Sequence, residues 1–144
     1  MTSEEQIELV KRHYALNASG DYAAAEDLLT DDFVITIPSF LPFAGVYRGK
    51  KAFRELIPRV VESLAVVKLK FVATTVGDDH AVEVVEFTLA GDDGATVQNA
   101  EVIRFCGQQI CEIRPFYHDP APWIAAAARL KATRTPGAST SSSS

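Results

Sequence analysis

The second half of the chain contains four strand-like segments in a row, and this run constrains the fold more than any other feature. The segments cover residues 66–77, 80–91, 96–107 and 109–118. Short turn sequences, "DD", "DDG" and "GQ", separate them, and this spacing predicts consecutive hairpins. Because helix-like segments precede the run and do not alternate with it, the order predicts an α+β fold with an antiparallel sheet.

Three helix-like segments and one short strand precede this run. The helices are expected over residues 3–19, 21–29 and 50–64, and the strand over residues 33–38. Ser3 can cap the first helix, with Gln6 completing a capping box, and Gly20 should end that helix. Asp21 can cap the second helix. Pro58 lies inside the third helix and should kink or divide it.

The remaining segments complete a single expected domain over residues 1–132. Residues 39–50 are rich in proline, glycine and aromatic side chains and predict a loop that partly covers the core. A short C-terminal helix is expected over residues 121–132, followed by a Ser-rich tail, residues 133–144, that should be disordered. Three N-terminal helices packed on one face of a strongly curved antiparallel sheet would form a cone-shaped barrel with an open end.

Composition excludes several classes of protein. The chain is 47% hydrophobic and 23% charged, which is typical of a soluble globular protein. Its net charge of −5 and its scattered basic residues exclude a nucleic-acid binder. It has no apolar run of about 18 residues, so no membrane span is expected. The N-terminus lacks the apolar core of a signal peptide, which predicts a cytoplasmic location.

The two cysteines, Cys106 and Cys111, flank the sequence "GQQI" and could face each other across a tight hairpin. A structural disulfide is uncommon in a reducing cytoplasm. A metal site would need more cysteine or histidine ligands close by. We therefore expect two free thiols that pack as small hydrophobic groups, and no metal or cofactor.

Three strings in the sequence resemble the SnoaL-like branch of the nuclear transport factor 2-like superfamily. They are "ALNASGDYAAAEDLLTDDFVITIP", "FAGVYRGKKAFREL" and "EIRPFYHDP". The branch includes ketosteroid isomerases, polyketide cyclases, limonene epoxide hydrolases and scytalone dehydratases. The resemblance implies a barrel with an apolar pocket inside the cone, and a homodimer. It says less about chemistry, because one scaffold hosts many reactions.

The resemblance to ketosteroid isomerases implies some site residues for this chain, but their general base has no counterpart in it. Their first-helix tyrosine aligns with His13, although Tyr14 beside it continues the apolar stripe of this helix. Their general base aligns with Ile37, which cannot perform that role. Their second site acid aligns with Glu101, and in those enzymes an apolar pocket keeps this acid protonated. Both Tyr14 and His13 remain candidates for donating a hydrogen bond to a ligand.

The match to limonene epoxide hydrolases is also incomplete. Their arginine and aspartate, two residues apart on one strand, align with Asn99 and Glu101. Their later aspartate aligns with Phe116. A complete hydrolase set of that kind is therefore missing.

The strand pattern itself makes Glu101 the main candidate for catalysis. Residues that share its face are Val97, Asn99, Ile103 and Phe105. A carboxylate on such an apolar face is costly unless it is paired or protonated, so burial would raise its pKa. The alternative is that this face is turned outward, or that an arginine neutralises the charge.

Glu83 is the second candidate carboxylate. It shares its face with Ala81, Val85, Phe87 and Leu89. If the turn after Leu89 has five residues, Glu83 lies opposite Glu101, whereas a change of one residue flips the face. Two close carboxylates would separate their pKa values and supply an acid and a base side by side. Otherwise Glu83 is a solvated residue at a dimer rim.

The stretch "EIRPFYHDPAPW", residues 112–123, ends the sheet and begins the last helix. The resemblance places Ile113 and Tyr117 on the inner face, whereas Arg114 and His118 lie on the other face. His118 is therefore expected to be structural, and Asp119 can bond the backbone of the following turn. Trp123 should close one end of the cone, either as core or as a ligand contact.

These observations leave two functional hypotheses. The first is a small enzyme that acts on an apolar small molecule by carboxylate acid–base catalysis, with Glu101 as principal acid and Glu83, Tyr14 or His13 assisting. The second is a binding module without chemistry, favoured by the missing base at Ile37. Residues expected to contact the ligand in both cases are Asn99, Tyr117, Ile113, Ile37, Phe87 and Trp123. The outer face should pair with a second copy, because it carries Val82, Val84, Ala100, Val102 and Phe116.

Overall fold

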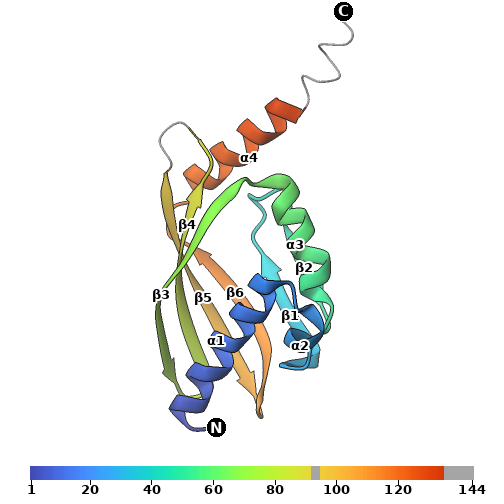
Figure 1. Cartoon of the computed structure of the whole chain (residues 1–144), viewed down its shortest axis with the longest axis vertical. Coiled ribbons are helices and arrows are strands. Elements are labelled where there is room, and N and C mark those ends of the chain that lie inside the picture. The colour runs from blue at the N-terminus through green and yellow to red at the C-terminus, as the bar shows by residue number, and fades with distance from the viewer. Residues whose placement is uncertain (92–94, 135–144) are drawn as a thin grey trace, which may run out of the picture.

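The computed structural model describes residues 1–91 and 95–134. Its elements follow the order helices first, strands second, with one helix at the end (Figure 1). They are α1 (Ser3–Ser19), α2 (Tyr22–Glu26), β1 (Leu29–Ile37), β2 (Gly45–Arg48), α3 (Ala52–Ser63), β3 (Val66–Gly77), β4 (His80–Leu89), β5 (Thr96–Cys106), β6 (Gln109–Tyr117) and α4 (Pro120–Arg134). The α+β class and the four strands expected from the hairpin signals are confirmed.

The strands form one curved sheet in the order β2-β1-β6-β5-β4-β3. All neighbouring pairs are antiparallel except β1 and β6, which are parallel, so the sheet is mixed and not antiparallel throughout. Turn sequences report only the pairing of strands that a hairpin connects. No hairpin connects β1 to β6, so no turn in the sequence indicated their direction.

The helices lie on the concave side of the sheet, as a cone requires. Figure 1 shows α1 crossing this side, α3 facing it from the side of β1 and β2, and α4 beyond the end that β3 and β4 reach. The sheet does not close into a complete barrel, because β2 and β3 are its two edges. The arrangement leaves an interior between α1, α3 and the strands.

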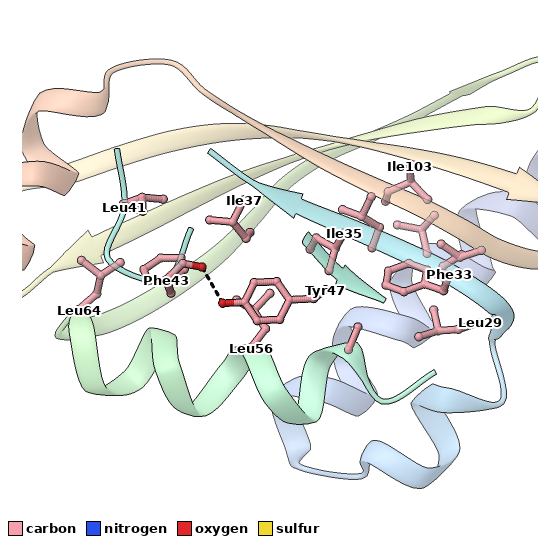
Figure 2. Close-up of a cluster of buried hydrophobic side chains, with 14 of the residues drawn as sticks. Leu29, Phe33, Ile35, Ile37, Leu41, Phe43, Tyr47, Leu56, Leu64 and Ile103 are labelled. Atoms are coloured by element: carbon pink, nitrogen blue, oxygen red, sulfur yellow. Dashed lines mark hydrogen bonds between the residues drawn. The ribbon is translucent and has the colours of Figure 1, made fainter. Parts of the chain in front are cut away.

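The part of the core under α3 is built on β1. The buried side chains of β1 lie between this strand and the helices beneath it (Figure 2): Leu29, Phe33, Ile35 and Ile37. Tyr47 of β2 packs beside them, and its hydroxyl donates to the backbone oxygen of Phe43 at 2.7 Å. Strand β2 lies where the sequence predicted only a loop, because its four residues are too short to show a pattern.

The first helix is capped differently from expected. The N-cap is Thr2, whose hydroxyl accepts a hydrogen bond from the backbone nitrogen of Glu5. In return, the Glu5 carboxylate accepts a hydrogen bond from the backbone nitrogen of Thr2. This is a complete capping box one residue before the Ser3 and Gln6 pair that the sequence suggested. Gly20 ends the helix with φ of 82°, as expected, because glycine adopts the left-handed conformation without strain.

Two expectations for the other helices were also inexact. Helix α3 runs as one helix from Ala52 to Ser63 with Pro58 inside it, so the proline does not divide the helix. Helix α4 extends to Arg134, two residues beyond the expected boundary. The rest of the expected tail, residues 135–144, and the expected turn residues 92–94 lie outside the described residues.

The expectation of two free thiols was wrong, because Cys106 and Cys111 form a disulfide. The β5–β6 hairpin brings their Cα atoms to 5.7 Å, within the usual range for a disulfide. Such bonds are rare in cytosolic proteins, so this one gives no support to the expected cytoplasmic location. Among the helices that the structure describes, none is long and apolar enough to cross a membrane.

Candidate functional site

A cavity of about 210 Å³ lies between the concave face of the sheet, α1 and α3. Most of its walls are aliphatic or aromatic. The polar side chains among its lining residues are few, and they are Tyr14, Asn17, Asn99, Glu101 and Tyr117. A mostly apolar cavity with a few convergent polar groups is the usual form of a small-molecule site.

Glu101 reaches this cavity from the middle of β5, on the face that the strand pattern predicted. Its side chain is half-buried. Burial raises the pKa of Glu101 to about 7, and the charge of Glu83 acts in the same direction. A hydrogen bond from Tyr14 opposes this rise, because it favours the ionised carboxylate.

Tyr14 projects from α1 toward the same point. Its hydroxyl donates a short hydrogen bond to Oε1 of Glu101. Burial raises the pKa of Tyr14 well above its ordinary value, and the charge of Glu101 adds to this. Tyr14 therefore stays a hydrogen-bond donor at neutral pH.

His13, the neighbour of Tyr14, points elsewhere. It is 1% exposed and is not among the lining residues of the cavity. Its ring packs against Phe53 at 5.0 Å, and Asn17 Nδ2 lies 3.0 Å from its Nε2. Burial lowers the pKa of His13 to about 4, so the ring is neutral at neutral pH. The structure thus separates the two first-helix candidates and brings only Tyr14 to Glu101.

Glu83 lies directly opposite Glu101 in the β4–β5 ladder. The backbone nitrogen of Leu89 donates to the backbone oxygen of Ala95, so five residues lie between this bonded pair. This is the turn length that was expected to place Glu83 opposite Glu101. Even so, Glu83 does not line the cavity. It is 2% exposed, accepts a short hydrogen bond from the Thr74 hydroxyl, and lines a separate outer pocket.

The outer pocket also contains Lys11 and the other side of Tyr14. Burial raises the pKa of Glu83, while the Thr74 hydrogen bond and the Lys11 charge lower it. Tyr14 is therefore the one side chain common to both spaces among the residues described. The two carboxylates face each other across the ladder, yet each lines a different space.

All of the predicted ligand-contact residues line the inner cavity: Asn99, Tyr117, Ile113, Ile37, Phe87 and Trp123. The aromatic members form a connected group, since the Trp123 ring lies 4.9 Å from Phe87 and 5.0 Å from Tyr117. Burial raises the pKa of Tyr117, and the charge of Glu101 contributes. Tyr117 is therefore also a neutral hydroxyl.

Helix α3 supplies lining residues that the sequence did not indicate as site residues. They recur at three- and four-residue spacing: Phe53, Leu56, Ile57, Val60 and Val61. This spacing is typical of any buried helix face and carries no functional signal of its own. Val61 is 66% exposed and Leu69 of β3 is 41% exposed, so the apolar rim between α3 and β3 faces solvent.

Two other residues of the stretch 112–123 make local contacts, and the expected bond of Asp119 to the following turn is present. Asp119 accepts from the backbone nitrogen of Ala121 at 3.2 Å. Arg114 lies over the ring of Phe116 at 5.3 Å, away from the cavity. Within residues 1–91 and 95–134, no group of three or more His, Cys, Asp or Glu side chains is placed to hold a metal ion.

Comparison with models of protein families identifies the family that has this fold. Residues 10–113 match the model of the SnoaL-like domain. The chain belongs to this family. In this SnoaL-like chain the match includes Tyr14, Glu83, Asn99 and Glu101, whereas Tyr117 and Trp123 lie beyond its end. No curated protein sequence matches the chain.

Solved structures similar to the SnoaL-like chain share its fold. Bal32a, from a soil-derived mobile gene cassette, is 22% identical with a TM-score of 0.73, covering 86% of this chain and 97% of its own. TerC, co-crystallised with polyporic acid, is 15% identical with a TM-score of 0.73, covering 86% and 98%. A candidate polyketide cyclase from Xanthomonas campestris pv. campestris is 20% identical with a TM-score of 0.65, covering 87% and 98%. At these identities the likeness establishes the fold.

Proposed function

We propose that this SnoaL-like chain is a small enzyme that moves a proton on an apolar molecule held in the inner cavity. Glu101 is the general acid and base, and Tyr14 holds it. The observation that supports this most is the Tyr14–Glu101 hydrogen bond at the wall of an apolar cavity. With a pKa of about 7, Glu101 populates both protonation states at neutral pH, which suits general acid–base catalysis.

The geometry of the carboxyl group suggests how the proton moves. Tyr14 engages Oε1, which leaves Oε2 as the oxygen that can face a ligand. The ionised carboxylate accepts a proton at Oε2 from an acidic C–H or O–H bond of the substrate. The same oxygen then returns the proton to another atom of the substrate. The enzyme ends in its starting state, as an isomerase or cyclase requires.

The size of the cavity limits the substrate. A dry cavity of about 150 Å³ is enough to bind benzene. The cavity of about 210 Å³ in this chain therefore suits a molecule of one or two rings. A candidate polyketide cyclase and a protein co-crystallised with polyporic acid share the fold, which favours a small organic ligand.

Hydrogen–deuterium exchange tests the proposal without knowledge of the natural substrate. The probe is 2-tetralone, a bicyclic ketone with exchangeable C–H bonds next to its carbonyl, followed by NMR in deuterated buffer. The wild-type protein should accelerate the exchange, and Glu101→Gln should reduce the acceleration by about 100-fold or more. The matched control is Glu86→Gln, which removes a carboxylate from β4 that does not line the cavity. Equal rates for wild type and Glu101→Gln would overturn the assignment.

A binding module without chemistry is the second candidate. It is favoured by Ile37, which lines the cavity where a resemblance to ketosteroid isomerases implied a base. This candidate predicts that 2-tetralone binds without faster exchange. The same NMR samples distinguish the two, because binding shifts protein resonances whether or not exchange occurs.

We also propose that the protein is a homodimer through the outer sheet face. Val82 lies opposite Val102 on neighbouring strands, and Ala100 lies between Val84 and Phe116. Phe116 is 48% exposed, which is costly for an aromatic ring in solvent.

Polar side chains beside these apolar residues of the outer sheet face fit the rim of an interface. Gln98 bonds Glu86 at 3.3 Å at one end, and Arg104 pairs with Glu112 at 3.3 Å at the other. An apolar centre with a polar rim is the usual anatomy of a protein interface. Sedimentation should show a dimer at micromolar concentration that Phe116→Lys converts to monomer, and a wild-type monomer would contradict the proposal.

A further inference from the structure

Three side chains that line the inner cavity each carry a buried polar atom with no use in the proton transfer. The atoms are Oδ1 of Asn17, Oδ1 of Asn99 and Nε1 of Trp123, and none has a hydrogen-bond partner within the part of the chain that the structure describes. Asn17 lies on α1, where its Nδ2 is bonded to His13, whereas Asn99 and Trp123 are each 2% exposed. Because nearly all buried polar atoms in proteins are paired, these unpaired atoms need an explanation.

Asn99 and Trp123 lie in one region of the cavity. Asn99 pairs with Tyr117 across the β5–β6 ladder, and the Trp123 ring contacts that tyrosine at 5.0 Å. A hydrogen bond from Asn99 lowers the otherwise raised pKa of Tyr117, so the amide group is held by this neighbour. Asn99 is two residues before Glu101 on the same face of β5, which places it about 7 Å along the strand from the carboxylate.

We propose that Asn99 and Trp123 form a subsite for a hydroxyl group of the ligand. The hydroxyl hydrogen donates to Oδ1 of Asn99, and the hydroxyl oxygen accepts from Nε1 of Trp123. This inference rests on the proposed function, because it assumes that the inner cavity holds the ligand. It narrows the substrate class to cyclic alcohols, enols or phenols.

Other polar groups fit the subsite less well. A carbonyl can only accept, so it satisfies Trp123 and leaves the Asn99 oxygen unpaired. A carboxylate has the same defect and adds a negative charge near Glu101. An ammonium group can only donate, and burying its charge in an apolar cavity is costly. A hydroxyl supplies the donor and the acceptor in one neutral group.

The single tryptophan of the chain makes the proposal directly measurable, since Trp123 gives the only indole N–H resonance in a nitrogen-15 NMR spectrum. The probes are 2-naphthol and 2-methylnaphthalene, which have the same ring system and differ in the hydroxyl. We expect 2-naphthol to bind roughly tenfold more tightly, the effect of one satisfied polar pair. The indole resonance should move downfield with 2-naphthol and should not with 2-methylnaphthalene.

Variants test which side chains cause the preference for 2-naphthol over 2-methylnaphthalene. Trp123→Phe keeps an aromatic ring and removes the N–H, and Asn99→Leu keeps the size and removes the amide, so each should abolish most of the preference for 2-naphthol. Glu83→Gln, outside the cavity wall, is the matched control and should retain it. If Glu101→Gln removes the preference while Trp123→Phe retains it, the hydroxyl binds at the carboxylate and the subsite is wrong.

The wild-type protein alone also decides the outcome if a variant fails to fold. Equal affinity for the two probes with an unmoved indole resonance overturns the subsite and leaves cavity binding intact. Binding of neither probe contradicts cavity binding itself, and with it the proposed function. Tight 2-naphthol binding with a shifted indole resonance supports the subsite even if 2-tetralone exchange fails.

Discussion

Glu83 and Glu101 are the same residue type, face each other on neighbouring strands and lie on the same face of one sheet, yet the protein places their charges in different surroundings. Glu101 opens on the apolar inner cavity, where Tyr14 is its hydrogen-bond partner. Glu83 opens on the outer pocket, where Thr74 donates to it and the charge of Lys11 favours its ionised form.

The two environments also affect how the carboxyl groups titrate. The charge of Glu83 raises the pKa of Glu101, whereas the causes that shift Glu83 are burial, Thr74 and Lys11. The titration of Glu101 is therefore coupled to the charge of Glu83.

The largest effect should come from Glu101→Gln. Besides the loss of proton transfer, this change should remove a pH-dependent penalty on stability. The folded pKa of about 7 lies above the ordinary value of 4.5, so the unfolded chain loses its proton at lower pH than the folded chain. Wild-type stability should therefore fall as pH rises from about 4.5 to about 7, by up to about 3 kcal/mol at ~1.4 kcal/mol per pH unit.

The measurement is denaturant unfolding of both proteins from pH 4 to pH 8. The advantage of Glu101→Gln should be close to zero at pH 4 and should reach its plateau above pH 7. Glu86→Gln serves as the control, because its carboxylate lies outside the cavity wall. A difference that does not vary with pH would identify Glu101 as an ordinary surface glutamate.

Tyr14→Phe should have the next largest effect. The Tyr14 hydroxyl favours the ionised form of Glu101, so its removal should raise the pKa of Glu101 further. The protein should lose about 1.5–3 kcal/mol of stability at pH 8, where the bond has a charged acceptor, and less at pH 5. Carbon-13 NMR of the Glu101 carboxyl group measures the midpoint of its pH titration directly. A midpoint that falls or stays unchanged would show that Tyr14 does not control this carboxylate.

The positions of side chains on the sheet were predictable where the evidence was local. Asn99, Glu101 and Phe87 line the cavity, in keeping with the alternation of side chains along a strand, and a turn of five residues was enough to relate Glu83 to Glu101. The environments of the two glutamates were not predictable in this way. Thr74 reaches Glu83 from the bulged edge strand β3, and no local pattern reports that contact.

The first helix shows the same limit. The apolar stripe favoured Tyr14 and the family resemblance favoured His13, and the structure buries His13 against Phe53 while Tyr14 meets Glu101. Neighbouring helix positions point about 100° apart, so both can face inward toward different partners. Which partner each meets depends on α3 and β5, which are remote in the sequence. The parallel β1–β6 pairing was missed for the same reason.

Glu83→Gln should have a smaller effect, and it should shift the pKa of Glu101 in the opposite direction to Tyr14→Phe. Removing the charge of Glu83 should lower the pKa of Glu101, because that charge is one of the causes of its rise. The amide oxygen of glutamine can still accept from Thr74, so stability should change by only about 1 kcal/mol. The Glu101 midpoint is followed by carbon-13 NMR in both proteins. If the midpoint does not move, the two carboxyl groups titrate independently and the coupling described above is wrong.

Lys11→Met should have the smallest effect and tests whether Tyr14 isolates the two spaces. Lys11 lowers the pKa of Glu83 and is absent from the causes that shift Glu101. The change should therefore raise the midpoint of Glu83 and leave that of Glu101 nearly unchanged. Lys11 is exposed, so its contribution to stability should stay below about 1 kcal/mol and should fade in high salt. A larger shift at Glu101 than at Glu83 would mean that the outer charge reaches the cavity directly, and the two carboxylates would then share one environment.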